Sequence, residues 1–215
     1  MRLYYLVMRL FCQLAFVLYF RGRVFGRSNV PQVDGVVLAC NHQSYFDPAS
    51  AGLALPREVN FIARDTLFLN PFFGRLISSV NAFPVKRGVA DISAVKEMLR
   101  RLKAGKLVLV FPEATRSHDG AIGRINPNSL AVAKKAGVPI VPAVVDGAFE
   151  AWPRDRLLPR PRSMHVTYAE PLSVDQVEQW SVEELAETVA ERMAVALRDS
   201  AARRRRCERG GLGRC

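Results

Sequence analysis

A histidine and an aspartate lie five residues apart, directly after an apolar run. The segment NHQSYFD, residues 41–47, follows the apolar residues 36–40. Histidine is the side chain best suited to accept a hydroxyl proton near neutral pH, and it needs a partner that orients its ring and stabilises the imidazolium. A carboxylate that a tight turn brings back can be that partner. The spacing therefore predicts a general base at His42 that is oriented by Asp47.

Asp47 also has the properties of a helix start. Aspartate is favoured as an N-cap, and the next residue, Pro48, is favoured at the first helical position. Capping a helix and orienting a histidine do not exclude each other, because one carboxylate can do both. The helix interpretation alone does not explain why His42 lies where a strand ends.

A second group of charged side chains follows the apolar run 107–111. Glu113, Thr115 and Arg116 come directly after Pro112, which ends the run. An arginine in such a loop suits a phosphate or carboxylate, because its guanidinium donates paired hydrogen bonds. The alternative is a surface Glu–Arg pair of small energetic value.

A third apolar run, residues 82–85, also ends in cations. Lys86 and Arg87 follow it directly. Cations at two separate strand ends indicate an anionic substrate, since charges that serve only solubility would be scattered.

Apolar runs alternate with helical segments along the chain. The runs typical of strands are residues 36–40, 59–63, 82–85, 107–111, 140–144 and 164–168. The segments typical of helices are residues 48–55, 71–79, 91–103 and 129–136, with Asp91 as an N-cap and a capping box at residues 181–184 before a further helix. The alternation predicts an α/β fold: a single domain with a largely parallel sheet flanked by helices. The chemistry is then expected in loops at the carboxyl ends of the strands.

The amino end, residues 1–23, is the most hydrophobic part of the chain and belongs to a predicted membrane-associated helical segment, residues 1–34. Large apolar residues recur there at three- and four-residue intervals, and Arg9 and Gln13 interrupt them. The stretch 10–20 is too short to cross a bilayer, which needs roughly 20 apolar residues. We predict a helix that lies in the membrane interface with its arginines near lipid phosphates. A core helix and a tilted single span are the alternatives.

The composition narrows the possible partners. The chain has 215 residues, of which 49% are apolar, and a formal charge of +11. It is too apolar for a disordered protein, and its charge favours an anionic bilayer, a phosphorylated ligand or nucleic acid as a partner.

Residues 35–200 are predicted to be the catalytic domain, and residues 201–215, with four consecutive arginines, a disordered basic tail. These arginines lack interleaved aromatic residues, which argues against nucleic acid. The histidines and cysteines have no metal-ligand spacing, so no metal is expected.

Four segments of the chain resemble, in the same order, the sequence blocks of the glycerolipid acyltransferase family, which contains the 1-acylglycerol-3-phosphate acyltransferases. Residues 41–47 fit its NH-x4-D block, and residues 84–87 (PVKR) resemble its second, arginine-ending block. Residues 111–117 (FPEATRS) resemble its FPEGTRS block, and residues 138–143 (VPIVPA) its VPIVPV-type block. The resemblance covers roughly residues 35 to 170. NH-x4-D alone is a weak pattern, whereas four blocks in register are specific.

The resemblance implies transfer of a fatty acyl group from acyl-CoA or acyl carrier protein to a glycerolipid hydroxyl. The expected acceptor is the sn-2 hydroxyl of 1-acylglycerol-3-phosphate, in phospholipid biosynthesis at the cytoplasmic face of a membrane. His42 is then the general base and Asp47 orients it. The residues expected to bind the acceptor are Lys86, Arg87, Glu113, Thr115 and Arg116, and those expected to line the acyl pocket are Pro139 and Ile140. Because the thioester is already activated, no metal or other cofactor is expected, and an oxyanion needs only hydrogen-bond donors.

The chain departs from the family pattern at two places. Ala114 replaces the glycine of FPEGTRS, which predicts either ordinary backbone dihedrals there or a shifted loop. Asn126 and Pro127 lie in a segment where many relatives carry two lysines, which weakens the expectation of a lysophosphatidate acceptor. Another lysolipid acceptor, or a thioesterase in which the His–Asp pair activates water, is the alternative. A basic nucleic-acid-binding module is the less favoured one.

Overall fold

The computed structural model describes residues 3–86 and 91–210. Its strands form one seven-stranded sheet in the order β1-β7-β6-β2-β5-β3-β4. The strands are β1 (Arg23–Phe25), β2 (Val36–Cys40), β3 (Val59–Arg64), β4 (Ala82–Val85), β5 (Leu107–Val110), β6 (Ile140–Asp146) and β7 (His165–Tyr168). Adjacent strands are parallel except β6 and β7. The predicted α/β class with a largely parallel sheet is confirmed.

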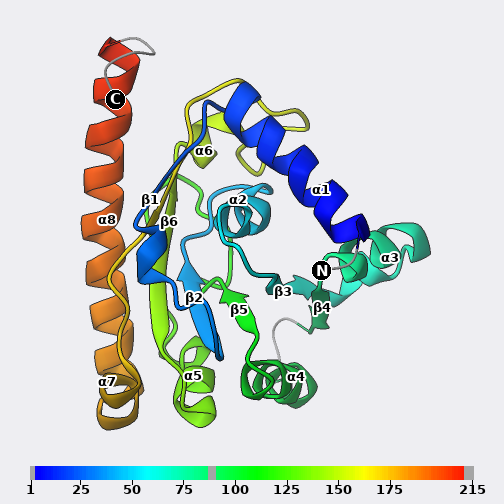
Figure 1. The fold of residues 1–215 in the computed structure, drawn as a ribbon, viewed down its shortest axis with the longest axis vertical. Helices are drawn as coiled ribbons and strands as arrows, with labels where there is room; N and C mark the ends of the chain where they lie inside the picture. The colour runs from blue at the N-terminus through cyan, green and yellow to red at the C-terminus, as the bar shows by residue number, and fades with distance from the viewer. Residues whose placement is uncertain (1–2, 87–90, 211–215) are drawn as a thin grey trace.

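Helices cover both faces of the sheet (Figure 1). The α-helices are α1 (Leu3–Leu14), α2 (Asp47–Leu53), α3 (Pro71–Ser79), α4 (Ile92–Lys103), α5 (Ala131–Ala136), α6 (Ala148–Ala151), α7 (Val174–Gln179) and α8 (Val182–Gly210). Short helical turns are η1 (Ala15–Tyr19), η2 (Arg27–Asn29), η3 (Asp65–Phe68) and η4 (Pro127–Ser129). In β2, Val37 and Ala39 pack toward α4, α5 and α8, whereas Leu38 and Cys40 pack toward α2 and η1. Every residue of β2 is therefore buried, as expected of a central parallel strand.

Helix caps lie where the sequence predicts them. The Asp91 side chain accepts hydrogen bonds from the backbone N–H groups of Ser93 and Ala94 at the start of α4. At the start of α8, the Glu184 side chain accepts from the Ser181 N–H at 2.7 Å, and the Glu184 N–H donates to Ser181 Oγ at 3.2 Å. Both predicted caps are confirmed.

The polar residues that interrupt the amino-terminal apolar run fasten α1 to α2. The Arg9 guanidinium donates to the Leu55 carbonyl, and Gln13 Nε2 donates to the Leu53 carbonyl at 2.6 Å. These carbonyls lie at and just beyond the C-terminus of α2, where helix carbonyls lack intrahelical partners. Arg9 therefore contacts protein, and the expectation that it lies at lipid phosphates was wrong. Among residues 3–86 and 91–210, no helix combines the length and the hydrophobicity that crossing a membrane requires.

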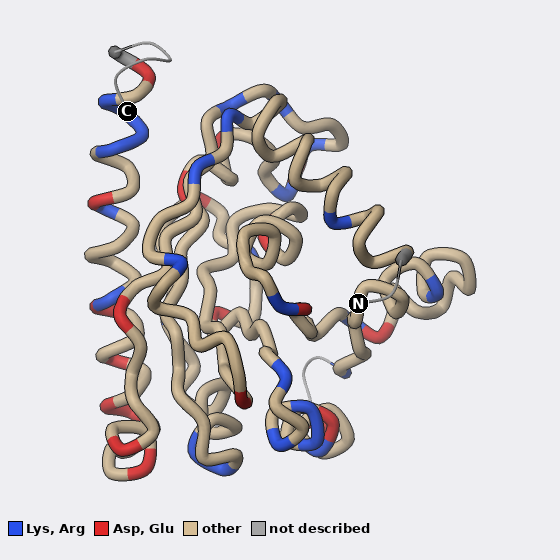
Figure 2. The backbone as a smooth tube through the Cα atoms, viewed as in Figure 1, with Lys and Arg blue, Asp and Glu red and all other residues tan. Residues whose placement is uncertain are grey.

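The carboxyl-terminal arginines do not begin a disordered tail at residue 201. Helix α8 continues to Gly210, and residues 211–215 lie outside the described residues. Arg204 Nε donates to Asp146 Oδ2 at 2.9 Å, and Arg204 Nη2 donates to Glu150 Oε1 at 2.8 Å. These contacts attach the end of α8 to the end of β6. Many of the other basic residues lie on α4, α8 and the loop between α6 and β7, and the rest are spread over the other elements (Figure 2).

His165 makes the stability of this region depend on pH. Its side chain is 1% exposed on β7, and burial, followed by the nearby charges of Arg204 and Arg23, lowers its pKa from 6.5 to about 4. Below pH 6.5 the unfolded chain binds a proton that the native protein does not bind, so native stability falls as the pH falls to about 4. The shift corresponds to a loss of about 3 kcal/mol.

We expect His165→Leu to remove most of this pH dependence. Urea unfolding at neutral pH and near pH 4.5 measures it in both proteins. An equally steep loss of stability in the variant and in the wild-type protein would contradict the assignment to His165.

Candidate active site

One carboxylate oxygen organises the loop that follows β2. Asp47 Oδ2 lies 2.9 Å from His42 Nδ1 and accepts the backbone N–H groups of Gln43 and Ser44, both at 2.6 Å. Asp47 is fully buried in the first turn of α2, and the N-cap position is Phe46, which makes no side-chain cap bond. The carboxylate thus faces back into the loop and not along the helix. The interpretation of Asp47 as an N-cap is corrected, whereas its position facing His42 is as expected.

Asn41 fastens the end of β2 to β6. Its side chain is fully buried, its Oδ1 accepts the Val145 N–H at 2.7 Å, and its Nδ2 donates to the Val145 carbonyl at 3.2 Å. The amide thus bonds to β6 as another strand residue would, one position before His42. The sequence patterns did not predict this role. The available signal was an amide side chain immediately after five buried apolar residues.

The loop after β5 surrounds His42 on several sides. The Phe111 ring stacks on the imidazole with a centroid distance of 4.0 Å, and the Ser117 N–H donates to the His42 carbonyl at 2.7 Å. Glu113 Oε1 accepts the His42 N–H at 2.8 Å, and Glu113 Oε2 accepts the Gly123 N–H at 2.7 Å. Burial raises the pKa of Glu113, and these two N–H groups oppose the rise. Both oxygens of this carboxylate are therefore engaged by backbone donors.

Arg116 is the cation nearest to this arrangement in the loop. Its guanidinium carbon lies 3.7 Å from the centroid of the Tyr45 ring, and Tyr45 belongs to the His42–Asp47 loop. Among the described residues, Arg116 Nη1 is buried without a hydrogen-bond partner. An unsatisfied buried donor costs roughly 1–3 kcal/mol, which an anionic ligand would offset. The neighbouring Thr115 is exposed.

The structure does not bring the other predicted residues next to His42. Lys86 follows β4, which is separated from β2 by β5 and β3, so that three inter-strand spacings, about 14 Å, lie between the strands. Arg87 lies outside the described residues. Ile140 is buried at the opposite end of β6, paired with Val37, and the Pro139 carbonyl accepts the Val37 N–H there. The geometry thus gives no support to an acyl pocket at Pro139 and Ile140.

The backbone differs between the two places where the chain departs from the family pattern, at Ala114 and in the segment that begins at Asn126. Ala114 has a φ of 60°, so the loop keeps a left-handed conformation although it has no glycine there. Of the two alternatives predicted for this position, ordinary dihedrals are excluded. At the second place, the Asn126 side chain accepts the Asn128 N–H at 3.0 Å and begins η4, while the Asn126 N–H donates to the Pro112 carbonyl at 2.9 Å. This segment therefore braces the start of the Glu113 loop.

Comparisons with known proteins identify the family of the chain. The sequence model of the Acyltransferase family matches residues 21–146. A 1-acyl-sn-glycerol-3-phosphate acyltransferase of Bacillus subtilis is 31% identical over 134 residues, covering 61% of this chain and 66% of the relative. One of Pseudomonas aeruginosa is 28% identical over 192 residues, covering 80% and 70%.

A solved structure is similar over most of the chain. The 1-acyl-sn-glycerophosphate (LPA) acyltransferase of Thermotoga maritima superposes with a TM-score of 0.77 at 30% identity, covering 92% of this chain and 78% of that one. The chain spans just under two thirds of the Bacillus relative and 45% of a chloroplastic 1-acyl-sn-glycerol-3-phosphate acyltransferase of Brassica napus.

The left-handed backbone at Ala114 predicts opposite effects for two Ala→Gly substitutions. Ala114→Gly should stabilise the protein by about 0.5–1 kcal/mol, because relief of the strain exceeds the entropy that glycine adds to the unfolded chain. Ala121→Gly is the matched control, because Ala121 is also exposed and its φ is not positive. It should destabilise by a similar amount. Urea unfolding measures both, and a loss of stability in Ala114→Gly would contradict the argument.

Proposed function

The chain belongs to the Acyltransferase family, and from this premise we propose that it transfers a fatty acyl group from a thioester to the sn-2 hydroxyl of 1-acylglycerol-3-phosphate, a step of phospholipid biosynthesis. The observation that carries the proposal is the contact between the partly exposed His42 and the buried Asp47 at the carboxyl end of the central strand β2. The loop after the adjacent strand β5 adds Arg116 beside it. The names of the relatives support the choice of acceptor.

In the proposed reaction His42 moves a proton from the acceptor hydroxyl oxygen to the sulfur of the leaving thiolate. His42 Nδ1–H donates to Asp47 Oδ2, which leaves Nε2 free to accept the proton of the acceptor hydroxyl. The hydroxyl oxygen attacks the thioester carbonyl, and the tetrahedral intermediate collapses with breakage of the carbon–sulfur bond. The leaving thiolate takes the proton back from His42 Nε2. Asp47 stabilises the imidazolium in between. The activated thioester makes a covalent enzyme intermediate unnecessary.

The acceptor phosphate is assigned to Arg116, whose unpartnered Nη1 faces away from solvent beside Tyr45. Thr115 stays in the proposed acceptor site because it is exposed next to Arg116. Lys86 stays a prediction, because it follows β4, three inter-strand spacings away from β2. Glu113 receives a different role, because its two oxygens already hold the His42 and Gly123 N–H groups. We assign it to positioning the base.

The enzyme is proposed to work at the cytoplasmic surface of an anionic membrane. Helix α1 and η1 turn Arg9 and Gln13 toward α2 and leave large apolar side chains exposed on the other side. These are Leu6, Val7, Leu10, Phe11, Leu14, Val17 and Leu18. An amphipathic helix of this kind suits the bilayer interface. Acyl-CoA or acyl carrier protein serves as co-substrate, and neither a metal cofactor nor nucleic acid belongs to the proposal.

We expect His42→Ala to lower acyl transfer by about 10³-fold, and Asp47→Asn by a comparable factor, because the base is lost or left without its orienting acceptor. The assay uses detergent-solubilised protein, labelled acyl-CoA and 1-acylglycerol-3-phosphate. His118→Ala is the matched control, because His118 is exposed and contacts Arg154. Transfer that survives in His42→Ala would exclude His42 as base. Free fatty acid as the product with or without acceptor would indicate a thioesterase.

The two roles considered for Glu113 predict different kinetics. If Glu113 positions His42, Glu113→Gln should lower kcat by about tenfold to a hundredfold with little change in the KM for the acceptor, because one backbone bond is lost. Arg116→Lys provides the comparison, since a change at the phosphate should raise that KM. A raised KM with unchanged kcat in Glu113→Gln would restore its role in acceptor binding.

A further inference from the structure

The segment formed by η3 and α3 exposes an unusual amount of apolar surface. Its exposed large apolar residues are Leu67, Leu69, Phe72, Phe73 and Leu76, with Leu69 79% and Phe72 82% exposed. The segment is nevertheless regular. The Asn70 side chain caps α3 by accepting the Phe72 and Phe73 N–H groups at 3.1 and 3.0 Å. Clustered apolar side chains on an ordered helix indicate a contact surface, whereas single exposed ones need no explanation.

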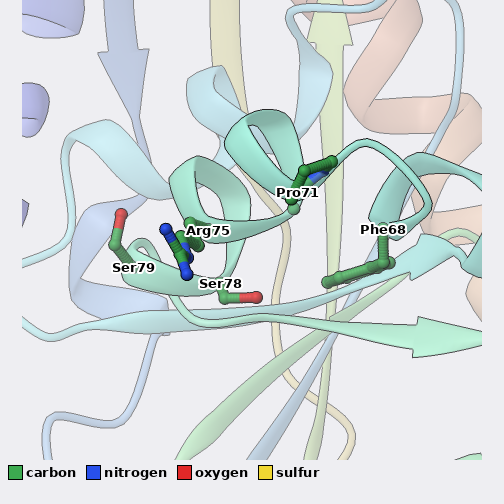
Figure 3. Close-up of a pocket in the computed structure, with 6 residues that line it drawn as sticks. Phe68, Pro71, Arg75, Ser78 and Ser79 are labelled. Carbon is green, nitrogen blue, oxygen red and sulfur yellow. The ribbon is translucent and has the colours of Figure 1, made fainter.

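Two hollows lie against this helix. One, of about 530 Å³, is lined by Phe68, Pro71, Gly74, Arg75, Ser78 and Ser79. Figure 3 shows Arg75, Ser78 and Ser79 on α3, with Phe68 on the preceding turn. The other, of about 350 Å³, is lined by Tyr4 of α1 together with Phe72, Arg75, Leu76 and Ser79. The exposed apolar faces of α1 and α3 therefore meet at this second hollow.

Arg75 gives this surface its charge. It lines both hollows and is exposed, and within residues 3–86 and 91–210 it forms no ion pair with a carboxylate. A cation surrounded by apolar side chains complements a phosphate at the border of a hydrocarbon layer.

The position of α3 links this surface to the candidate active site. Strand β3 runs parallel to β5, and η3 and α3 leave the carboxyl end of β3, the same sheet edge at which His42 and Glu113 lie. Figure 1 shows α1 extending along one side of the molecule with its first turn beside α3. The two apolar elements thus adjoin the edge at which the reaction is proposed.

We infer that η3 and α3 form a second lipid-contact element, which inserts Leu69 and Phe72 into an anionic phospholipid surface and binds a lipid phosphate through Arg75. The inference rests on the proposed membrane association of α1, with which this surface is continuous. A second copy of the chain is a poorer occupant, because each copy carries a net charge of +11 and would present an unpaired cation to the other. The end of α8 lies on the far side of the molecule (Figure 1) and does not cover the surface.

Vesicle binding by the full-length protein tests the contact. We expect the double variant Leu69→Ser/Phe72→Ser to bind vesicles of phosphatidylcholine and phosphatidylglycerol about tenfold more weakly or worse. Ile92→Ser is the matched control, because Ile92 is 68% exposed on α4. Arg75→Gln should weaken binding by about fivefold on these vesicles and leave binding to pure phosphatidylcholine unchanged. Equal binding by the double variant and the control would overturn the inference.

A conservative substitution tests insertion directly. Phe72→Trp should gain fluorescence that brominated lipids quench, and Ile92→Trp, with the same native tryptophans, should gain none. Equal quenching in both variants would contradict lipid contact at α3. A wild-type dimer that the Leu69→Ser/Phe72→Ser double variant converts to a monomer would contradict it too.

Acyl transfer measured in detergent separates this inference from the proposed function. We expect the double variant to keep it, whereas a wild-type protein without transfer would contradict the proposed reaction alone.

Discussion

A single buried oxygen, Asp47 Oδ2, carries the constraint on which the candidate active site depends. It receives the imidazole of His42 and two backbone N–H groups of the same loop. A buried carboxylate needs donors that replace water, and here the donors to Oδ2 are the ones that fix His42, while Oδ1 has no hydrogen-bond partner among the described residues. The same carboxylate oxygen therefore orients His42 and closes the turn at residues 42–44. Any change that moves the start of α2 therefore moves His42.

This dependence extends outward to helix α1. Gln13 of α1 bonds to the last residue of α2, and Asp47 is the first residue of that helix. On the inner side, Asn41 ties the strand before His42 to β6, and Glu113 ties the His42 backbone to the loop after β5. His42 is thus held by contacts with α2 and the loop after β5, and the strand before it is held by β6. These hydrogen bonds orient His42 without a ligand, and preorganised groups of this kind favour transition-state stabilisation in enzymes.

The sequence predicted what local patterns and strand periodicity encode. The six predicted strands are present with small shifts of their ends, and parallel pairing of β2 with β5 brings the His42 and Glu113 loops together as the strand order implies. Contacts between distant residues were not predictable. Strand β1 has three residues and pairs with β7 far along the chain, and Arg204 pairs with Asp146 across 58 positions. The composition of residues 201–215 had indicated a disordered tail that would include Arg204.

The roles of individual side chains at the site show the same limit. The His42–Asp47 spacing identified a possible pair, but no pattern reveals that Asp47 Oδ2 also holds two backbone groups or that Glu113 is fully engaged. The most direct measurement is the tautomer of His42, observed by long-range proton–nitrogen NMR and assigned by comparison with His42→Gln. The structure predicts a neutral imidazole protonated at Nδ1, with Nε2 free to act as base. A neutral imidazole protonated at Nε2 would contradict the account.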